Sequence, residues 1–401
     1  MENKISSFIG ELKNIDRRTF ICSRLRNVLG GAVLGSVFLK QSEANAASRI
    51  AVPSAAWRQG ARVVASVGRH AISADAIAWR SDSQRVAWRC SNGPGYIFDV
   101  NSGTHGASLP APQNSGTTTG ILWLQDSNTL LLGGAPLGTP PFSPISLMVV
   151  NGENGEIIRI VEGAIPPHQA RDPSAIAPNF PLSPLANCAQ QIFQTSPTRD
   201  IVVRPFGGLR GFEIYNSVNW SAQIEKTDDL GGRFCDLRPD SMEAAFSFGR
   251  GIFFVIDRIS GRTLHRVYAH RADISAVKYS PNGEFLLTSM LLIGNGRNDQ
   301  TNFDSKEADR HKIKAWRADD CSFVGQIDAE MSACRAIDFH PDGEIFAVAA
   351  DREVVFFDTK TLTLLSRSDC PIEMMRAISF SPDGSWLAVS GTSGVVCLMR
   401  P

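Results

Sequence analysis

The sequence predicts an all-β fold, a seven-bladed β-propeller over residues 47–401, and two observations lead to it. A strand-turn-strand pattern returns about every forty residues, a period typical of four-stranded propeller blades. It is clearest near the C-terminus, where "CRAIDFHPDGEIFAVAA" (334–350) is followed by "MRAISFSPDGSWLAVSG" (375–391). The second observation is that a strand is missing at one end of the chain and spare at the other.

Seven copies of this hairpin run along the chain, each with an apolar or aromatic strand, a Pro/Asp/Asn/Gly/Ser turn and a second apolar strand. The residues that anchor the seven turns are Trp79, Trp123, Thr195, Leu237, Tyr279, Phe339 and Phe380. Most steps between anchors are 41 to 44 residues, and two are stretched to 72 and 60. Further strands follow the hairpins, as in "GYIFDVNSGTHGASL" and "IFFVIDRISGRTLHRVY". Each repeat therefore supplies one four-stranded blade.

The last repeat is incomplete, because the chain stops at "GVVCLMRP" after three strands. An open ring would expose the edge of a sheet, which proteins avoid. The segment "ARVVASVG", residues 61–68, lies ahead of the first repeat and belongs to no other blade. We expect this N-terminal strand to become the outer strand of the last blade and to close the ring.

The charge balance argues against nucleic acid as a partner. Lys plus Arg equals Asp plus Glu, at 40 each, so the chain has no overall basic field. Residues 1–46 hold seven basic and four acidic groups, which leaves 33 against 36, or minus three, for the rest. We expect a nearly neutral body that forms a monomeric ring.

Residues 1–46 have the three-part layout of a secretory signal peptide. The pair Arg17-Arg18, followed by Thr19 and Phe20, resembles the twin-arginine motif. An apolar run of twelve residues, 28–39, is too short to span a bilayer comfortably, and the small residues 44–46 form a cleavage site. This predicts a periplasmic or secreted protein that meets the membrane only during export. An uncleaved anchor and a cytosolic basic arm are the alternatives.

Eight cysteines are present, and Cys22 would leave with the signal peptide. No Cys/His spacing typical of structural zinc or c-type haem occurs. Among the remaining seven, disulfides in an oxidising periplasm and small buried apolar side chains are both open.

Three hairpins, "YSPNG" (279–283), "FHPDG" (339–343) and "FSPDG" (380–384), resemble the first hairpin of the WD40 family. The resemblance covers roughly residues 60–401 by its period. The family's Trp-Asp dipeptide is absent: Asp99, Asp257 and Asp358 keep its acidic half, and Trp316-Arg317 its aromatic half. His270 lies near the family's Gly-His position without the glycine. These departures weaken the expectation that the chain keeps the family's internal hydrogen-bond network of His, Ser/Thr and Trp.

One face of the expected ring is enlarged. Because blade strands alternate in direction, the connections between second and third strands share a face with the links between blades. The three long insertions, 133–146, 162–190 and 290–311, all belong to this loop-bearing face. Long loops in a compact domain are commonly functional, so we expect a protein or an anionic ligand to bind there.

The same face is expected to carry arginines at the channel mouth. Superposing the repeats aligns the following residues at the start of the innermost strand: Asp75, Thr119, Gln191, Arg233, Ser275, Arg335 and Arg376. Three guanidinium groups, Arg233, Arg335 and Arg376, with Asp75 beside them, suit a carboxylate, a phosphate or an acidic peptide. The alternative is structural: the arginines reach solvent or pair with Asp75, Asp236 or Asp338.

These observations favour an exported binding or scaffold module. The sequence contains no motif that assigns catalytic residues, metal ligands or a cofactor. The alternative is a propeller enzyme or enzyme subunit that resembles a quinoprotein amine dehydrogenase heavy chain or a lactonase.

Overall fold

A computed structural model of the chain describes residues 51–68, 73–90, 93–113, 120–124, 128–133, 135–136, 147–161, 194–195, 201–205, 212–216, 222–226, 234–248, 251–271, 274–290, 313–327, 331 and 334–401. The chain divides into two units, of which Ile50–Pro401 is a compact body. The predicted signal peptide, residues 1–46, lies outside the described residues.

The described residues form seven four-stranded antiparallel sheets, six of them with their strands in chain order and the seventh with the N-terminal strand β1 as its outer strand. The first sheet contains β2 (Ala74–Trp79), β3 (Arg85–Cys90), β4 (Gly95–Asp99) and β5 (Thr104–Leu109), and the second β7 (Ile121–Trp123), β8 (Thr129–Gly133), β10 (Leu147–Asn151) and β11 (Ile157–Val161). The third contains β12 (Gln194–Thr195), β13 (Ile201–Pro205), β14 (Phe212–Asn216) and β15 (Ala222–Lys226), and the fourth β16 (Cys235–Leu237), β17 (Glu243–Phe248), β18 (Ile252–Asp257) and β19 (Thr263–Tyr268).

The fifth sheet contains β20 (Ile274–Tyr279), β21 (Phe285–Met290), β22 (Ile313–Arg317) and β23 (Phe323–Ile327), and the sixth β24 (Ala336–Phe339), β25 (Ile345–Ala349), β26 (Glu353–Asp358) and β27 (Leu364–Asp369). The seventh is built from β28 (Met375–Phe380), β29 (Leu387–Gly391), β30 (Val396–Arg400) and β1 (Arg62–Val67). Two further pieces complete the list: β6 (Pro112–Gln113) pairs with β9 (Ala135–Pro136), and η2 (Ser54–Gln59) is a 3₁₀ helix.

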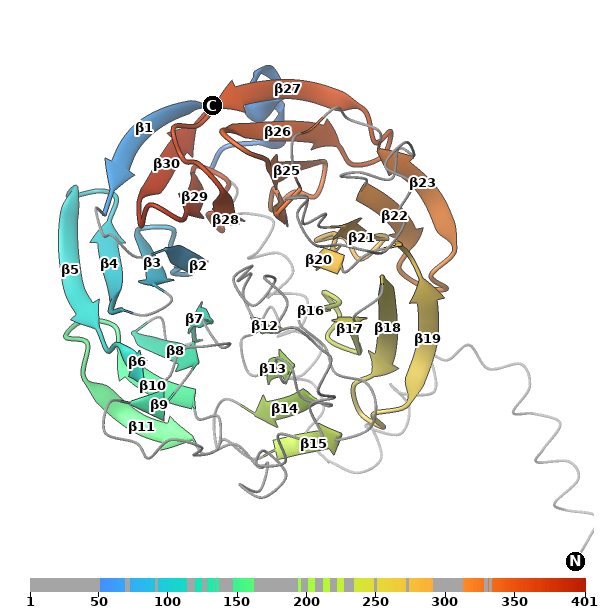
Figure 1. The fold of residues 1–401 in the computed structure, drawn as a ribbon, viewed down its shortest axis with the longest axis horizontal. Helices are drawn as coiled ribbons and strands as arrows, with labels where there is room; N and C mark the ends of the chain where they lie inside the picture. Colours follow the sequence, from blue (N-terminus) through green and yellow to red (C-terminus); the bar gives the residue numbers. More distant parts are fainter. Residues whose placement is uncertain are drawn as a thin grey trace, which may run out of the picture. The chain divides into compact units, whose positions relative to one another are not determined.

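Within residues 50–401 the sheets are arranged around a centre, with the first strand of each sheet innermost (Figure 1). Apolar side chains fill the space between neighbouring sheets: one core cluster joins the sixth and seventh sheets, another the seventh and first, and a third the first and second. This packing follows from the pattern of the inner strands, whose side chains are buried on both faces, as all six residues of β2 are. The architecture is the β-propeller that the sequence predicts.

The closing strand is confirmed. β1 pairs antiparallel with β30, from Arg62 opposite Arg400 to Val67 opposite Val396. The N-terminal strand therefore supplies the outer strand that the last repeat lacks.

Residues just ahead of β1 attach the N-terminal segment to the ring, a contact that no sequence pattern indicated. Trp57 on η2 is completely buried between Phe356 and Phe380, and its indole N–H donates to the Gly384 carbonyl at 3.0 Å. Loss of a buried Trp side chain typically costs about 3–5 kcal/mol. The N-terminal segment therefore packs against the seventh sheet through Trp57 and also supplies the outer strand of that sheet.

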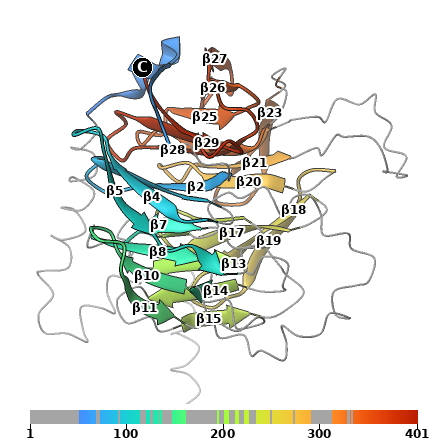
Figure 2. The same ribbon diagram turned by 60° about the vertical axis from the view of Figure 1, so that its left-hand side comes forward.

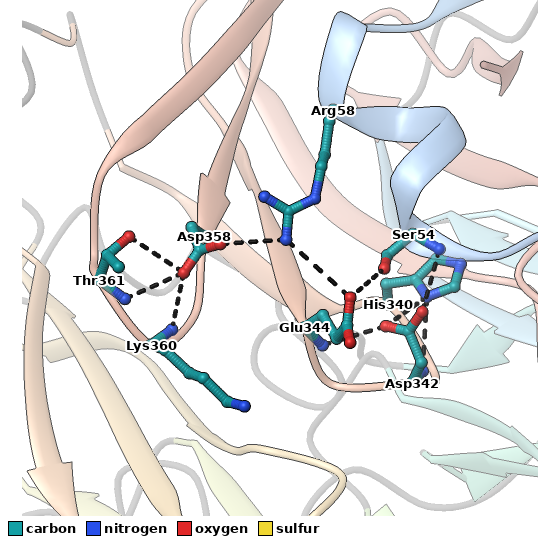
Figure 3. A network of polar contacts seen from close by, with 8 residues as sticks. All are labelled: Ser54, Arg58, His340, Asp342, Glu344, Asp358, Lys360 and Thr361. Atoms are coloured by element: carbon teal, nitrogen blue, oxygen red, sulfur yellow. Dashed lines mark hydrogen bonds and ion pairs between the residues drawn. The ribbon is translucent and has the colours of Figure 1, made fainter.

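Polar contacts hold the same segment to the turns of the sixth sheet (Figure 3). The Ser54 backbone N–H donates to Asp342 Oδ2 at 2.9 Å, and Arg58 Nη2 lies 3.0 Å from Asp358 Oδ2. Val52 O lies 3.0 Å from Nε2 of the buried His340. Each contact joins residues almost 300 positions apart.

The Asp residues at the turns between third and fourth strands have a structural role that does not require the Trp of the family's dipeptide. Asp358 Oδ1 accepts the backbone N–H groups of Lys360 and Thr361, at 3.1 and 2.9 Å. Asp99 does the same for Asn101 and Ser102. These are Asx turns, in which the carboxylate satisfies the turn backbone.

Six cysteines lie among the described residues, and all are buried: Cys90, Cys235, Cys321, Cys334, Cys370 and Cys397. Of the two possibilities left open by the sequence, these six are small buried side chains. No helix within the described ranges is long and apolar enough to cross a membrane.

Candidate functional site

Two of the predicted mouth residues occupy the same special position in neighbouring sheets. Asp75 lies between the paired residues Ala74 and Ala76 of β2, and Arg376 between Met375 and Ala377 of β28; both are the extra residue of a β-bulge. A bulge turns its side chain away from the regular pleat and is frequent next to functional sites. β2 and β28 are in contact, so the two bulges are adjacent.

The pair is buried and opposite in charge. Asp75 is 3 % exposed and Arg376 9 %. Burial raises the pKa of Asp75 to about 6, opposed by a hydrogen bond from Ser73 Oγ at 2.5 Å and by the positive charge of Arg376. The structure therefore brings these two predicted residues together in a site from which water is largely excluded.

Arg335 differs from them. It precedes β24, and its Nε lies 3.2 Å from Asp351 Oδ1 within the same sheet. The structural alternative, an ion pair, thus holds for Arg335, but its partner is not one of the acids that the sequence suggested. Arg233 and the three insertions 133–146, 162–190 and 290–311 lie outside the described residues, apart from Gly133, residues 135–136 and Met290.

Asp236 and Asp338 have a different partner, which sequence reasoning missed. Lys278 Nζ lies 3.3 Å from Asp338 Oδ1 and 4.0 Å from Asp236 Oδ1. The other carboxylate oxygens accept backbone N–H groups of the next sheet, Tyr279 at 2.7 Å and Phe380 at 2.8 Å. Burial raises the pKa of Asp236 to about 6 although Lys278 opposes it. The available signal was the residue before each turn anchor, which reads Asp, Lys and Asp in the fourth, fifth and sixth sheets.

The fifth sheet contains a polar network that the absent Trp-Asp dipeptide had argued against. His270 Nε2 lies 2.8 Å from Thr288 Oγ1, and the Trp316 indole N–H donates to the same hydroxyl at 3.0 Å. Nearby, Ser275 Oγ lies 2.8 Å from Ser289 Oγ and donates to the Cys334 carbonyl at 2.9 Å. The fifth sheet therefore has a hydrogen-bond network of His, Thr and Trp, which the missing Trp-Asp dipeptide had put in doubt.

In the first and seventh sheets, some buried polar groups at the level of this network lack hydrogen-bond partners within the described residues. Arg89 is fully buried, and among the described residues none of its three guanidinium nitrogens has a hydrogen-bond partner. The buried atoms Trp88 Nε1 and Ser390 Oγ also lack partners within the described part of the chain. Buried polar groups are normally hydrogen-bonded, so these atoms are exceptions within the described part of the chain.

Three segments match the family model described as WD domain, G-beta repeat: residues 261–297, 321–358 and 364–398. The chain is a WD40-like β-propeller. Each WD40 match begins at or just before an outer strand and continues into the inner strands of the next sheet, as 364–398 covers β27 followed by β28, β29 and most of β30. In the same phase, the outer strand β1 precedes the first sheet along the chain, and β30 is the third strand of the last sheet. No curated protein matches the chain.

The described residues of this WD40-like propeller contain no group of three or more His, Cys, Asp or Glu side chains that could hold a metal ion. The arrangement they do contain is one of buried opposite charges and unsatisfied donors. Chemically, it is suited to recognising an acidic group.

Proposed function

We propose that the protein is an exported, seven-bladed WD40-like propeller that serves as an interaction scaffold in the periplasm. WD40 repeats generally mediate protein interactions, and three of them are present. The seven four-stranded sheets, with β1 completing the last, are consistent with a closed ring of seven blades.

The binding site of this proposal is the loop-bearing end of the inner strands, at Asp75, Arg335 and Arg376. The observation that carries it is the adjacent pair of bulges, which present a buried carboxylate and a buried guanidinium at one end of the ring. Bringing charges this close out of water is costly unless they serve pairing or recognition. The chemistry of this end favours an acidic segment of a protein partner, which a guanidinium binds through two parallel hydrogen bonds.

The test is a binding comparison on the full exported chain. Partners are cross-linked in the periplasm and quantified for the wild type and for Arg335→Ala combined with Arg376→Ala. A matched control, Arg159→Ala with Arg266→Ala, removes the same charge from exposed positions on the outer strands β11 and β19. We expect the first double variant, with folding verified by circular dichroism, to lose the cross-linked partner and the control to keep it. Loss of stability with binding intact would overturn the site.

Export is tested separately by fractionation of cells. Replacement of Arg17 and Arg18 by Lys should leave the chain in the cytoplasm if the twin-arginine motif directs it. Accumulation of this variant in the periplasm at the wild-type level would contradict the export route.

A further inference from the structure

We infer that Arg89 is an internal receptor for a small carboxylate ligand, bound between the first and second sheets. The inference goes beyond the proposed scaffold function, because Arg89 lies on a second strand between two sheets and not at the bulged start of an innermost strand. The two sites can therefore fail separately.

Arg89 is the one described arginine that is completely buried and has no partner. Its exposed fraction is 0 %, and its three guanidinium nitrogens make no hydrogen bond within the described residues. Burial lowers the pKa of Arg89 to about 9, which still leaves the group charged at neutral pH. A buried charge is normally paired, so a guanidinium in this state requires an anion.

Two arginines at the other end of the β2–β3 hairpin are paired with carboxylates. Arg80 Nη2 lies 2.8 Å from Asp82 Oδ2, and Arg85 Nη1 lies 2.6 Å from Glu153 Oε1. Both acids belong to turns, and Glu153 comes from the second sheet. The first sheet therefore satisfies its arginines where the chain supplies a carboxylate.

The direction of Arg89 follows from the alternation of β3. Val86, Trp88 and Cys90 belong to the core between the first and seventh sheets, and Ala87 to the core between the first and second. Arg89 shares the face of Ala87 and so points toward the second sheet, which lies beside the first (Figure 2).

The residues paired with Arg89 on the neighbouring strands are small. Arg89 is paired with Ala76 on β2 and with Gly95 on β4. In the second sheet the two corresponding positions are Gly120 and Gly133, whose backbones are joined by a hydrogen bond of 3.1 Å. The neighbouring side chains are apolar, as Ile97 and Ile121 are.

The adjoining chain offers no carboxylate of its own at this end. The connections that reach the loop-bearing ends of these two sheets are residues 68–73, 91–94, 110–120 and 134–146, and none contains Asp or Glu. Asp75 is engaged by Ser73 and lies near Arg376. The counter-anion must therefore come from outside these connections, and the planar fork of a guanidinium can bind a carboxylate through two parallel hydrogen bonds.

The experiment measures the binding of sodium acetate and sodium succinate to the full chain at constant ionic strength, by thermal melting and by calorimetry. Sodium phosphate and sodium chloride serve as the comparison anions. A ligand of the folded state raises the melting temperature with its concentration. We expect a carboxylate-dependent rise for the wild type and a Kd at least about tenfold weaker in Arg89→Met, whose side chain has similar length and no charge.

Arg85→Met is the matched control, because it removes an arginine from the same strand at the paired end. It should retain the carboxylate response, and so should the double variant at Arg335 and Arg376. Circular dichroism of Arg89→Met verifies that it folds. An equal response in Arg89→Met and the wild type, or no response in the wild type, would overturn the inference, and a response to phosphate alone would overturn its ligand class.

Discussion

The fifth and first sheets carry different side chains on the same backbone frame. In the fifth sheet Val277 is opposite Thr288 and Ala276 is opposite Ser289; in the first, Ile77 is opposite Trp88 and Ala76 is opposite Arg89. The bulge residues also correspond, Ser275 in one and Asp75 in the other.

The difference lies in whether the polar groups find partners. Thr288 and Ser289 are hydrogen-bonded, whereas Trp88 Nε1 and all three nitrogens of Arg89 are not. The fifth sheet, whose strands β20 and β21 fall within a WD40 match, uses these positions for stability. The first sheet leaves buried donors open at the same level, which is where we expect a ligand to bind.

The largest effect is expected from Thr288→Val in the fifth sheet. His270 and Trp316 both contact the Thr288 hydroxyl, and its loss leaves two buried groups unsatisfied. We expect a fall of about 2–4 kcal/mol in the free energy of unfolding, measured with urea. Thr288→Ser keeps the hydroxyl and should lose less; equal losses would show that the network does not stabilise the sheet.

The next effect concerns the pH dependence of the first sheet. The pKa of Asp75 in the folded chain is raised to about 6 from 3.8, so the folded state favours the neutral carboxyl. Its contribution to stability is complete below about pH 4 and is lost as pH rises through about 6, by at most about 3 kcal/mol. Asp75→Asn, neutral at every pH, should remove this fall, which lies between about pH 4 and 6 and is measured by urea unfolding at pH values from about 4 to 7.

Cys90, which lies near Asp75, does not titrate in that range, since burial raises its pKa to about 11. The turn carboxylates Asp99 and Asp257 have pKa values lowered by backbone hydrogen bonds, so they stay ionised there. Parallel pH profiles of the wild type and Asp75→Asn would contradict the assignment.

A smaller effect of opposite sign is expected from Arg89→Met without added carboxylate. Removal of an unpaired buried charge in favour of an apolar side chain should raise the free energy of unfolding by about 1–2 kcal/mol. Arg80→Met should lower it, because Arg80 is paired with Asp82. If urea unfolding showed that both variants change the free energy of unfolding in the same direction, Arg89 could not be distinguished from the paired Arg80.

The smallest effect compares thiols in the two sheets. Cys90 ends β3 in the first sheet, and Cys334, whose carbonyl accepts from Ser275, packs against the fifth; burial raises their pKa values to about 11 and about 12. Both should resist iodoacetamide in the native state, as followed by peptide mass spectrometry. Faster labelling of Cys90 would show that the first sheet opens more readily.

The sequence predicted the architecture because its signals are local. Hairpins such as "FSPDG" place a Gly where the backbone needs positive φ, as at Gly384 with φ of 72°. The spare strand at 61–68 was also visible, since it is an alternating segment without a neighbour. The attachment by Trp57 was not, because its partners Phe356 and Phe380 are about 300 residues away.

The candidate site was predictable only in part. Alignment of the repeats placed Asp75 and Arg376 at equivalent positions, and the structure makes both of them bulge residues. The alignment of the repeats could not show that Arg335 would form an ion pair with Asp351, or that Lys278 would form one with Asp338.

The sequence alone determined the repeat, its turns and the strand that closes the ring, because each depends on residues within one repeat or on a count of strands. The tertiary structure decided which charges are paired. Arg80 and Arg89 are nine positions apart and alike in sequence, yet Arg80 reaches carboxylates, among them that of Glu153 in the next sheet, and Arg89 does not. Pairing depends on which side chains a neighbouring sheet presents, and only the folded ring brings the sheets together.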